Sequence, residues 1–241
     1  DPADPLRLTD EEEELLHTLE LSFRHNARLH EHVRFPYSNG SMYKCCNSNL
    51  LYHGCIPMTE NREFDGLMVG GKMYRGKELM DFIDTQVKNA YFLPEDAPEK
   101  EACRDFMWYL WNGAKSPVFG KDKNRSFEHY FIEDPEVMRE TMNPYYQLSE
   151  EEETCDMILK EFGLPTKGSH IINGHMPVKI KSGETPIRAG GKLFIIDGGL
   201  SKAYQERTGI AGYTLIFNSH HLALAEHKPF DPERERTPKV Y

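Results

Sequence analysis

The sequence predicts an α/β protein. Three short apolar segments occur late in the chain, His170–Asn173, Leu193–Ile196 and Tyr213–Phe217, and each ends at a turn of glycine or small polar residues. Short segments of this composition, bounded by turn residues, are typical of buried strands. Strand-like segments also occur early in the chain, and helical patterns lie between the two groups. We therefore expect helices to pack against a sheet.

Length and composition limit the classes of protein that the chain can represent. It has 241 residues, 39% of them hydrophobic and 28% charged, which suits one large domain or two small ones with a buried core. No apolar segment approaches the roughly 18–20 residues that a membrane-spanning helix needs. The net charge of −10 opposes binding to a phosphate backbone. We therefore expect neither a membrane nor a nucleic acid as a partner.

The cysteines and the first residues favour a cytoplasmic location. The chain has five cysteines, an odd number, and none of them forms a C-x-x-C pair. Free thiols are typical of a reducing compartment. The chain begins Asp1-Pro2-Ala3-Asp4, without the basic and apolar segments of a signal peptide. Because it also begins without Met, we expect it to be processed, truncated or incomplete.

The first expected helix begins near Thr9. Thr9 and Glu12 have the spacing of a capping box, in which each side chain binds a backbone N–H group at the start of a helix. We expect this helix to reach about His32 and to end before Pro36, because the residue before proline avoids helical angles. Apolar residues repeat along it every fourth position and give it one apolar face: Leu15, Leu19, Phe23 and Ala27.

A β-hairpin is expected next. Met42–Cys46 and Leu50–Cys55 have strand composition, and Asn47-Ser48-Asn49 forms a tight turn between them. His53 then lies at the end of the second strand, beside a glycine that lets another group approach closely. Residues 60–76 contain four glycines and are expected to form a loop.

Residues 72–166 are predicted to be a helical insertion in the α/β domain. Lys77–Val87 has an amphipathic pattern, and a second helix is expected to end at Gly113. Gly163 stands where the left-handed C-terminal cap of a further helix is expected. Beyond the insertion, Leu222–His227 is expected to form a hairpin with the third apolar segment.

Two histidines are the main candidates for chemistry. His53-Gly54 and Gly174-His175 each place an imidazole beside a glycine at the end of an apolar strand. Imidazole nitrogen is a good metal ligand, and the glycine lets a metal and a substrate oxygen come close. Asn173 and Asp197 lie at equivalent strand ends. A single histidine at a strand end more often has a structural role than a metal-binding one. Two such histidines with an acidic residue make the structural role and the metal-binding role about equally well supported.

Six segments closely resemble the class III fructose-1,6-bisphosphatases of bacteria. Together they extend over nearly the whole chain, and their sequences are specific to that family. They are Tyr52–Pro57, Trp108–Gly113, Asn143–Tyr146, Ile172–Lys179, Ile196–Gln205 and Thr208–Tyr213. More distantly, the family resembles the calcineurin-type metallophosphoesterases.

This resemblance implies a fold and a metal site. The implied fold is the second half of a calcineurin-like two-sheet sandwich flanked by helices. Residues 1–230 would be the C-terminal portion of a metallophosphoesterase domain, and the charged, proline-containing residues 231–241 a linker or tail. The implied site holds two divalent cations, here taken to be Mn²⁺. Carried over position by position, the resemblance makes His53 and His175 metal ligands.

The chain also departs from the calcineurin-type pattern. Such a site needs D-x-H, G-D-x-x-D-R-G and G-N-H-[ED] elements, and the sequence contains none of them. Those elements supply the aspartate between the metals, an asparagine and the general-acid histidine. Members of the family are also much longer than 241 residues. The resemblance therefore implies that the N-terminal half of the same enzyme completes the site, and it leaves a homo-oligomer open.

Basic residues near strand ends are candidates for binding phosphate, because phosphoryl transfer spreads charge over the phosphoryl oxygens. Lys179 follows the second histidine loop, and Lys202 lies in the loop after Asp197. Arg34 and Arg188 are weaker candidates. Asp197 is assigned a catalytic role as a group that orients a ligand histidine. A turn residue before two glycines is the equal alternative for it.

The sequence leads to three hypotheses for the function. The leading hypothesis is a metal-dependent hydrolase that converts fructose 1,6-bisphosphate to fructose 6-phosphate and phosphate in gluconeogenesis, with this chain inactive by itself. The second is a non-catalytic interaction module, which the missing acidic motifs favour. The third is a metallophosphoesterase for another phosphoester, because sequence does not locate the pocket walls that select a substrate.

Overall fold

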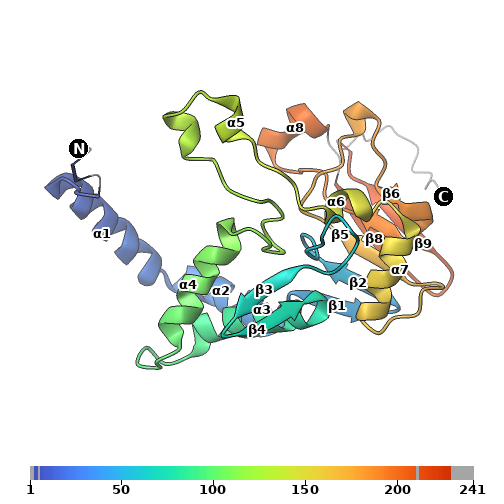
Figure 1. Cartoon of the computed structure of the whole chain (residues 1–241), viewed down its shortest axis with the longest axis horizontal. Coiled ribbons are helices and arrows are strands. Elements are labelled where there is room, and N and C mark those ends of the chain that lie inside the picture. The colour runs from blue at the N-terminus through green and yellow to red at the C-terminus, as the bar shows by residue number, and fades with distance from the viewer. Residues whose placement is uncertain (1–2, 5, 210–211, 229–241) are drawn as a thin grey trace. The chain divides into compact units, whose positions relative to one another are not determined.

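The computed structural model of the chain describes residues 3–4, 6–209 and 212–228 (Figure 1). The chain divides into two compact units, residues 1–41 and 42–241. Helices and sheets occur together, which confirms the α/β class. The tail expected at residues 231–241 lies outside the described residues.

The first unit contains two helices, α1 (Asp10–Arg24) and α2 (Ala27–Asn39). The predicted capping box at the start of α1 is confirmed. The Thr9 hydroxyl group accepts the backbone N–H of Glu12 at 3.3 Å, and the Glu12 carboxylate accepts the backbone N–H of Thr9 at 2.8 Å. The apolar residues predicted to line one face of α1 are exposed in the structure: Leu15, Leu19 and Phe23.

The single helix expected to reach His32 is wrong. Asn26 interrupts it, because its side chain accepts the backbone N–H of Leu29 at 2.9 Å and so begins a second helix. Helix α2 then continues through Pro36. Pro36 lies in the last turn, where its missing N–H group removes only one hydrogen bond from the helix.

A five-stranded sheet organises the second unit, with the order β1-β2-β5-β7-β6. The three inner strands are parallel, whereas the two outer strands pair antiparallel with their neighbours. Leu50, Ile171 and Leu193 form a buried row across the inner strands. The carboxyl ends of the inner strands therefore meet at one edge of the sheet. The strands are β1 (Tyr43–Cys46), β2 (Asn49–Tyr52), β5 (His170–Asn173), β6 (Ile187–Arg188) and β7 (Leu193–Ile195).

Two hairpins accompany this sheet. They are β3 (Gly66–Val69) with β4 (Lys72–Arg75), and β8 (Tyr213–Phe217) with β9 (Leu222–Glu226). The second hairpin was predicted and is confirmed. The first lies within the residues expected to form a loop, so that expectation is wrong. Gly70 and Gly71 have φ angles of +58° and +81°, which allow the tight turn between its strands.

Most helices of the second unit lie between β2 and β5. They are α3 (Gly76–Phe92), α4 (Lys100–Asn112), η1 (Glu128–Tyr130), α5 (Pro135–Met138), α6 (Tyr145–Leu148) and α7 (Glu152–Glu161). Helix α3 packs against α4 through Leu79, Ile83 and Leu110. Gly163 follows α7 with a φ angle of +73°, as a left-handed cap requires. After β5 come η2 (Ile180–Ser182), η3 (Ala189–Gly191) and α8 (Lys202–Thr208).

The main core joins the inner strands to α6 and α7. Tyr145 from α6 and Ile158 from α7 are buried against residues of β2, β5 and β7. All five cysteines are thiols in the structure, and Cys55, Cys103 and Cys155 are buried. No helix in the described part of the chain is long and apolar enough to cross a membrane.

The calcineurin-like two-sheet sandwich stays a prediction. The described residues form the five-stranded sheet and the two hairpins. The backbone N–H of Tyr213 donates to the carbonyl group of Ile196 at 3.0 Å, so the start of β8 is attached to the end of β7.

Candidate active site

The two predicted histidines face each other. His53 follows β2 directly, and His175 follows β5 after Gly174, so both lie beyond the carboxyl ends of adjacent parallel strands. Nε2 of His53 lies 3.3 Å from Nδ1 of His175, and the ring centroids are 5.2 Å apart with an interplanar angle of 79°. Two residues that are 122 positions apart in the sequence are thereby brought into one site.

Asp197 lies close to this pair, after the third parallel strand. A Cβ atom at Gly174 would lie 3.4 Å from Nδ1 of His53 and 3.7 Å from Cβ of Asp197, so Gly174 lies between them. Oδ1 of Asp197 accepts the backbone N–H of Gly199 at 2.9 Å, which is an Asx turn. Within the described residues this carboxylate makes no hydrogen bond to either imidazole, so its direct contacts are those of a turn residue.

His175 has a defined tautomer and a strained backbone. Its φ angle is +67°, in the left-handed region that residues with a side chain rarely adopt. Nε2 lies 3.2 Å from the carbonyl oxygen of Phe119. A carbonyl oxygen only accepts, so we assign the ring proton to Nε2, and Nδ1 then presents its lone pair to His53. Burial, and then the neighbouring His53, lower the pKa of His175, which favours the neutral ring.

Two carbonyl groups from the helical region hold the histidine loops. The backbone N–H of Cys55 donates to the carbonyl group of Pro117 at 2.8 Å. Phe119, two residues later, supplies the carbonyl group that binds His175. A Cβ atom at Gly54 would collide with the carbonyl oxygen of Pro117, so this close approach requires glycine.

The pair of imidazoles fits part of a cation site. Two nitrogen ligands about 2.1 Å from one ion lie roughly 3.0–3.4 Å apart. The separation of 3.3 Å between the two ring nitrogens falls in that range. No group of three or more His, Cys, Asp or Glu side chains in the described residues is arranged to hold a metal ion. A complete site therefore needs ligands in addition to these two rings.

Comparison with known proteins decides the family. The model of the Firmicute fructose-1,6-bisphosphatase family matches residues 1–239. The chain belongs to this family. The resemblance predicted from the sequence is confirmed.

Relatives with curated names support the same membership. The class 3 fructose-1,6-bisphosphatase of Bacteroides fragilis is 52% identical over 230 residues, which are 95% of this chain and 35% of the relative. A class 3 enzyme of Clostridium beijerinckii is 52% identical over 231 residues, 96% of this chain and 35% of the relative. The chain thus spans about a third of the length of these relatives. No solved structure matches the chain.

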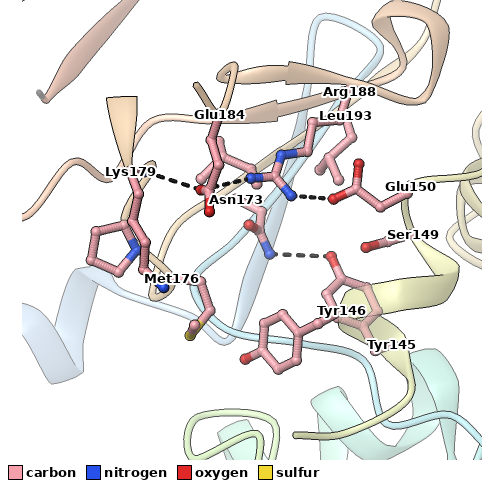
Figure 2. Close-up of a pocket in the computed structure, with 12 residues that line it drawn as sticks. Tyr145, Tyr146, Ser149, Glu150, Asn173, Met176, Lys179, Glu184, Arg188 and Leu193 are labelled. Atoms are coloured by element: carbon pink, nitrogen blue, oxygen red, sulfur yellow. Dashed lines mark hydrogen bonds and ion pairs between the residues drawn. The ribbon is translucent and has the colours of Figure 1, made fainter. Parts of the chain in front are cut away.

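A cavity of about 120 Å³ lies beside the His175 loop (Figure 2). Lys179 and Arg188 both line it. Arg188 forms ion pairs with Glu150 and, at 3.2 Å, with Glu184, so its charge is neutralised within the chain. Lys179 has no ion pair among the described residues, and its charge stays available to an anion.

Lys202, the second predicted lysine, is the exposed first residue of α8. Lys181 of η2 donates from Nζ to the carbonyl group of Glu206 in α8 at 2.8 Å. A Cβ atom at Gly199 would lie 2.9 Å from Cβ of Tyr204. Helix α8 therefore packs against both the loop that follows His175 and the loop that follows Asp197.

Proposed function

We propose that this chain is the histidine-bearing portion of a metal-dependent fructose-1,6-bisphosphatase. The enzyme would remove the 1-phosphate of fructose 1,6-bisphosphate and release fructose 6-phosphate and phosphate, a step of gluconeogenesis in the cytoplasm. Two relatives that are 52% identical carry the name fructose-1,6-bisphosphatase class 3. The family model extends over residues 1–239, so the likeness is not confined to one motif.

One observation carries the proposal: the ring nitrogens of His53 and His175 face each other at 3.3 Å. Neutral imidazole is the commonest metal ligand in proteins, and the Phe119 carbonyl leaves Nδ1 of His175 free of a proton. Hydrogen bonds from ligand histidines to backbone carbonyls are a regular feature of metal sites. These features support a role of the two rings as ligands of Mn²⁺ in a dinuclear site.

The other predicted residues have distinct roles in this proposal. The chemistry that a bound pair of Mn²⁺ ions supplies is polarisation of the phosphoryl oxygens and activation of the attacking water. Lys179 and Lys202 would bind phosphate oxygens and neutralise their charge. Asp197 would orient the His175 loop, because its carbonyl group accepts the backbone N–H of Val178 at 2.9 Å.

The remaining ligands are proposed to come from the N-terminal half of the same enzyme. Two imidazoles are too few to hold two ions, and the described residues place no third His, Cys, Asp or Glu side chain with them as a ligand. The relative from Bacteroides fragilis has about two thirds of its length outside the aligned region, since only 35% of it is covered. That length is sufficient for the missing acidic elements.

Substitution of His175 tests the proposal. We expect His175→Ala in the full-length protein to lower Mn²⁺-dependent phosphate release from fructose 1,6-bisphosphate by more than about 100-fold. Loss of a group that only supports a metal ligand already costs about 10–100-fold, and loss of the ligand itself should cost more. The measurement is the initial rate of phosphate release at saturating Mn²⁺.

His170→Ala is the matched control. His170 lies at the opposite end of β5, where Nδ1 is 2.9 Å from the carbonyl oxygen of Gly191 and the ring packs on Phe194. This variant loses a partly buried imidazole away from the site and should keep its Mn²⁺-dependent turnover. Undiminished turnover of His175→Ala would remove that residue from the mechanism. Hydrolysis of other phosphoesters in preference to fructose 1,6-bisphosphate would overturn the substrate assignment.

A further inference from the structure

A buried hydrogen-bond junction adjoins the histidine pair. Asn173, the last residue of β5, is 5% exposed. Its Nδ2 donates to the carbonyl group of Gly54 at 2.6 Å. It also donates to the hydroxyl group of Tyr145 at 3.1 Å, the bond that Figure 2 shows. The hydroxyl groups of Tyr145 and Tyr52 share a hydrogen bond of 2.6 Å. One side-chain amide therefore joins the residue that follows His53 to the strand leading into the second histidine loop.

The junction needs the two protons of the asparagine amide. The Gly54 carbonyl oxygen only accepts, and the Tyr145 oxygen accepts one proton from Asn173 while sharing another with Tyr52. Burial raises the pKa of both tyrosines, so their hydroxyl groups stay neutral near pH 7. An aspartate at position 173 would have nearly the same shape, but its ionised carboxylate only accepts. A carboxylate oxygen would then face the carbonyl oxygen of Gly54, and no hydrogen bond can form between two acceptors.

The junction acts together with a direct bond between the two loops. The backbone N–H of Gly174 donates to the carbonyl group of His53 at 2.9 Å. The neighbouring hydrogen bond between the loops runs from the Asn173 side chain to the carbonyl group of Gly54. Two successive bonds thus tie the loops together just before the rings of His53 and His175 meet. Of these two bonds, only the second is made by a side chain.

We propose that Asn173 is the positioning residue of the histidine pair, and that its amide sets the separation of the two imidazoles and so the affinity of the site for a divalent cation. This inference rests on the proposed function, because it takes both rings to be ligands. Asn173 bonds to neither ring, so it acts through the two loops.

The test is titration of the full-length protein with Mn²⁺ in a calorimeter. We expect Asn173→Asp to weaken Mn²⁺ binding by about 10–100-fold, the range for loss of a group that supports a metal ligand. Tyr145→Phe should have a smaller effect in the same direction, because the bond from Asn173 to Gly54 remains. Tyr43→Phe is its matched control, since the Tyr43 hydroxyl group donates to Oδ1 of Asp81 at 2.8 Å, outside the junction. It should keep the affinity of the wild type.

A second control separates positioning from general loss of stability. Ile83 is fully buried in the separate cluster between α3 and α4, so Ile83→Ala destabilises the fold away from the site. Positioning predicts weaker Mn²⁺ binding by Asn173→Asp and not by Ile83→Ala. Wild-type affinity in Asn173→Asp, or an equal fall in both variants, would overturn the proposal. Unchanged affinity in His175→Ala would instead overturn the ligand assignment under the proposed function.

A measurement without metal decides the matter if the wild type binds no Mn²⁺. Diethyl pyrocarbonate modifies unprotonated imidazole nitrogens, and mass spectrometry locates the modified rings. His175 is partly buried and bonded at both nitrogens, so it should react slowly in the wild type. A faster reaction of His175 in Asn173→Asp, but not in Ile83→Ala, supports positioning. Equal rates in the wild type and Asn173→Asp would refute it.

Discussion

The backbone of His175 is strained at the point where its ring meets His53. Its φ angle of +67° lies in a region that costs a residue with a side chain about 1–2 kcal/mol, apart from Asn and Asp. Such strain persists when surrounding contacts hold the residue in place. Here the contacts are the Phe119 carbonyl group at one ring nitrogen and His53 at the other. We interpret the strain as the consequence of directing Nδ1 toward the site.

A glycine at position 175 should relieve this strain. We expect His175→Gly to have a free energy of unfolding about 1 kcal/mol larger than His175→Ala, because only glycine adopts a positive φ without cost. Neither variant retains the ring, so the difference between them measures the contribution of the backbone conformation to the free energy of unfolding. The measurement is urea-induced unfolding of both variants, and equal values would show that the backbone at this position carries no strain.

His129 provides the matched pair of substitutions. It is exposed in η1 and has a negative φ angle. At that position the order should reverse, with His129→Ala more stable than His129→Gly by a few tenths to about 1 kcal/mol. If the stability difference between the Gly and Ala variants has opposite signs at positions 175 and 129, the sign of φ accounts for it.

At the scale of elements, the helical region between β2 and β5 contributes to the site as well as to the core. Tyr145 of α6 enters the junction with Asn173, and the carbonyl groups of Pro117 and Phe119 bind the two histidine loops. The segment after α4 therefore has to lie close to the end of β2. Gly54 is the position where that approach is tightest.

Gly54→Ala should weaken metal binding although Gly54 is no ligand. The added Cβ atom would collide with the Pro117 carbonyl oxygen, so the segment that carries Phe119 must move. We expect Mn²⁺ affinity of the full-length protein to fall by about 10-fold or more. Gly70→Ala is the control, because a Cβ atom there meets no other atom within 4 Å. It should lose about 1 kcal/mol of stability from its positive φ and keep its Mn²⁺ affinity.

The sequence was most informative about strands and strand ends. Apolar segments and turn residues located the end of β5 and placed the end of β7 at Ile196, one residue too far, whereas the strand expected to reach Cys55 ends at Tyr52. The parallel arrangement of these strands then brings His53 and His175 together. The hairpin β3–β4 was missed because its glycines indicate a loop as readily as a tight turn. The carbonyl groups of Pro117 and Phe119 could not be predicted, since every residue has a carbonyl group and only tertiary structure selects one. The Asn173 amide was visible as a polar strand end, but its two acceptors come from distant segments.

The site forms only when the second unit, residues 42–241, is folded. The sequence separates His53 from His175 by 122 positions, and Asp197 follows a further strand, β7. These residues meet only when the inner strands pair. An unfolded chain has no preformed site of this kind. Metal binding to the folded state should therefore be linked to the free energy of unfolding.

This linkage gives a prediction for the full-length protein. At a Mn²⁺ concentration 100 times the dissociation constant, we expect the free energy of unfolding to rise by about 2.7 kcal/mol per site, and EDTA should reverse the rise. The increase should be lost in His175→Ala, because the ion no longer has its ligand from the loop after β5. It should persist in His170→Ala, whose imidazole lies at the other end of that strand. Equal stabilisation of the wild type and His175→Ala would mean that Mn²⁺ binds elsewhere, and the measurement is thermal or urea unfolding with and without the ion.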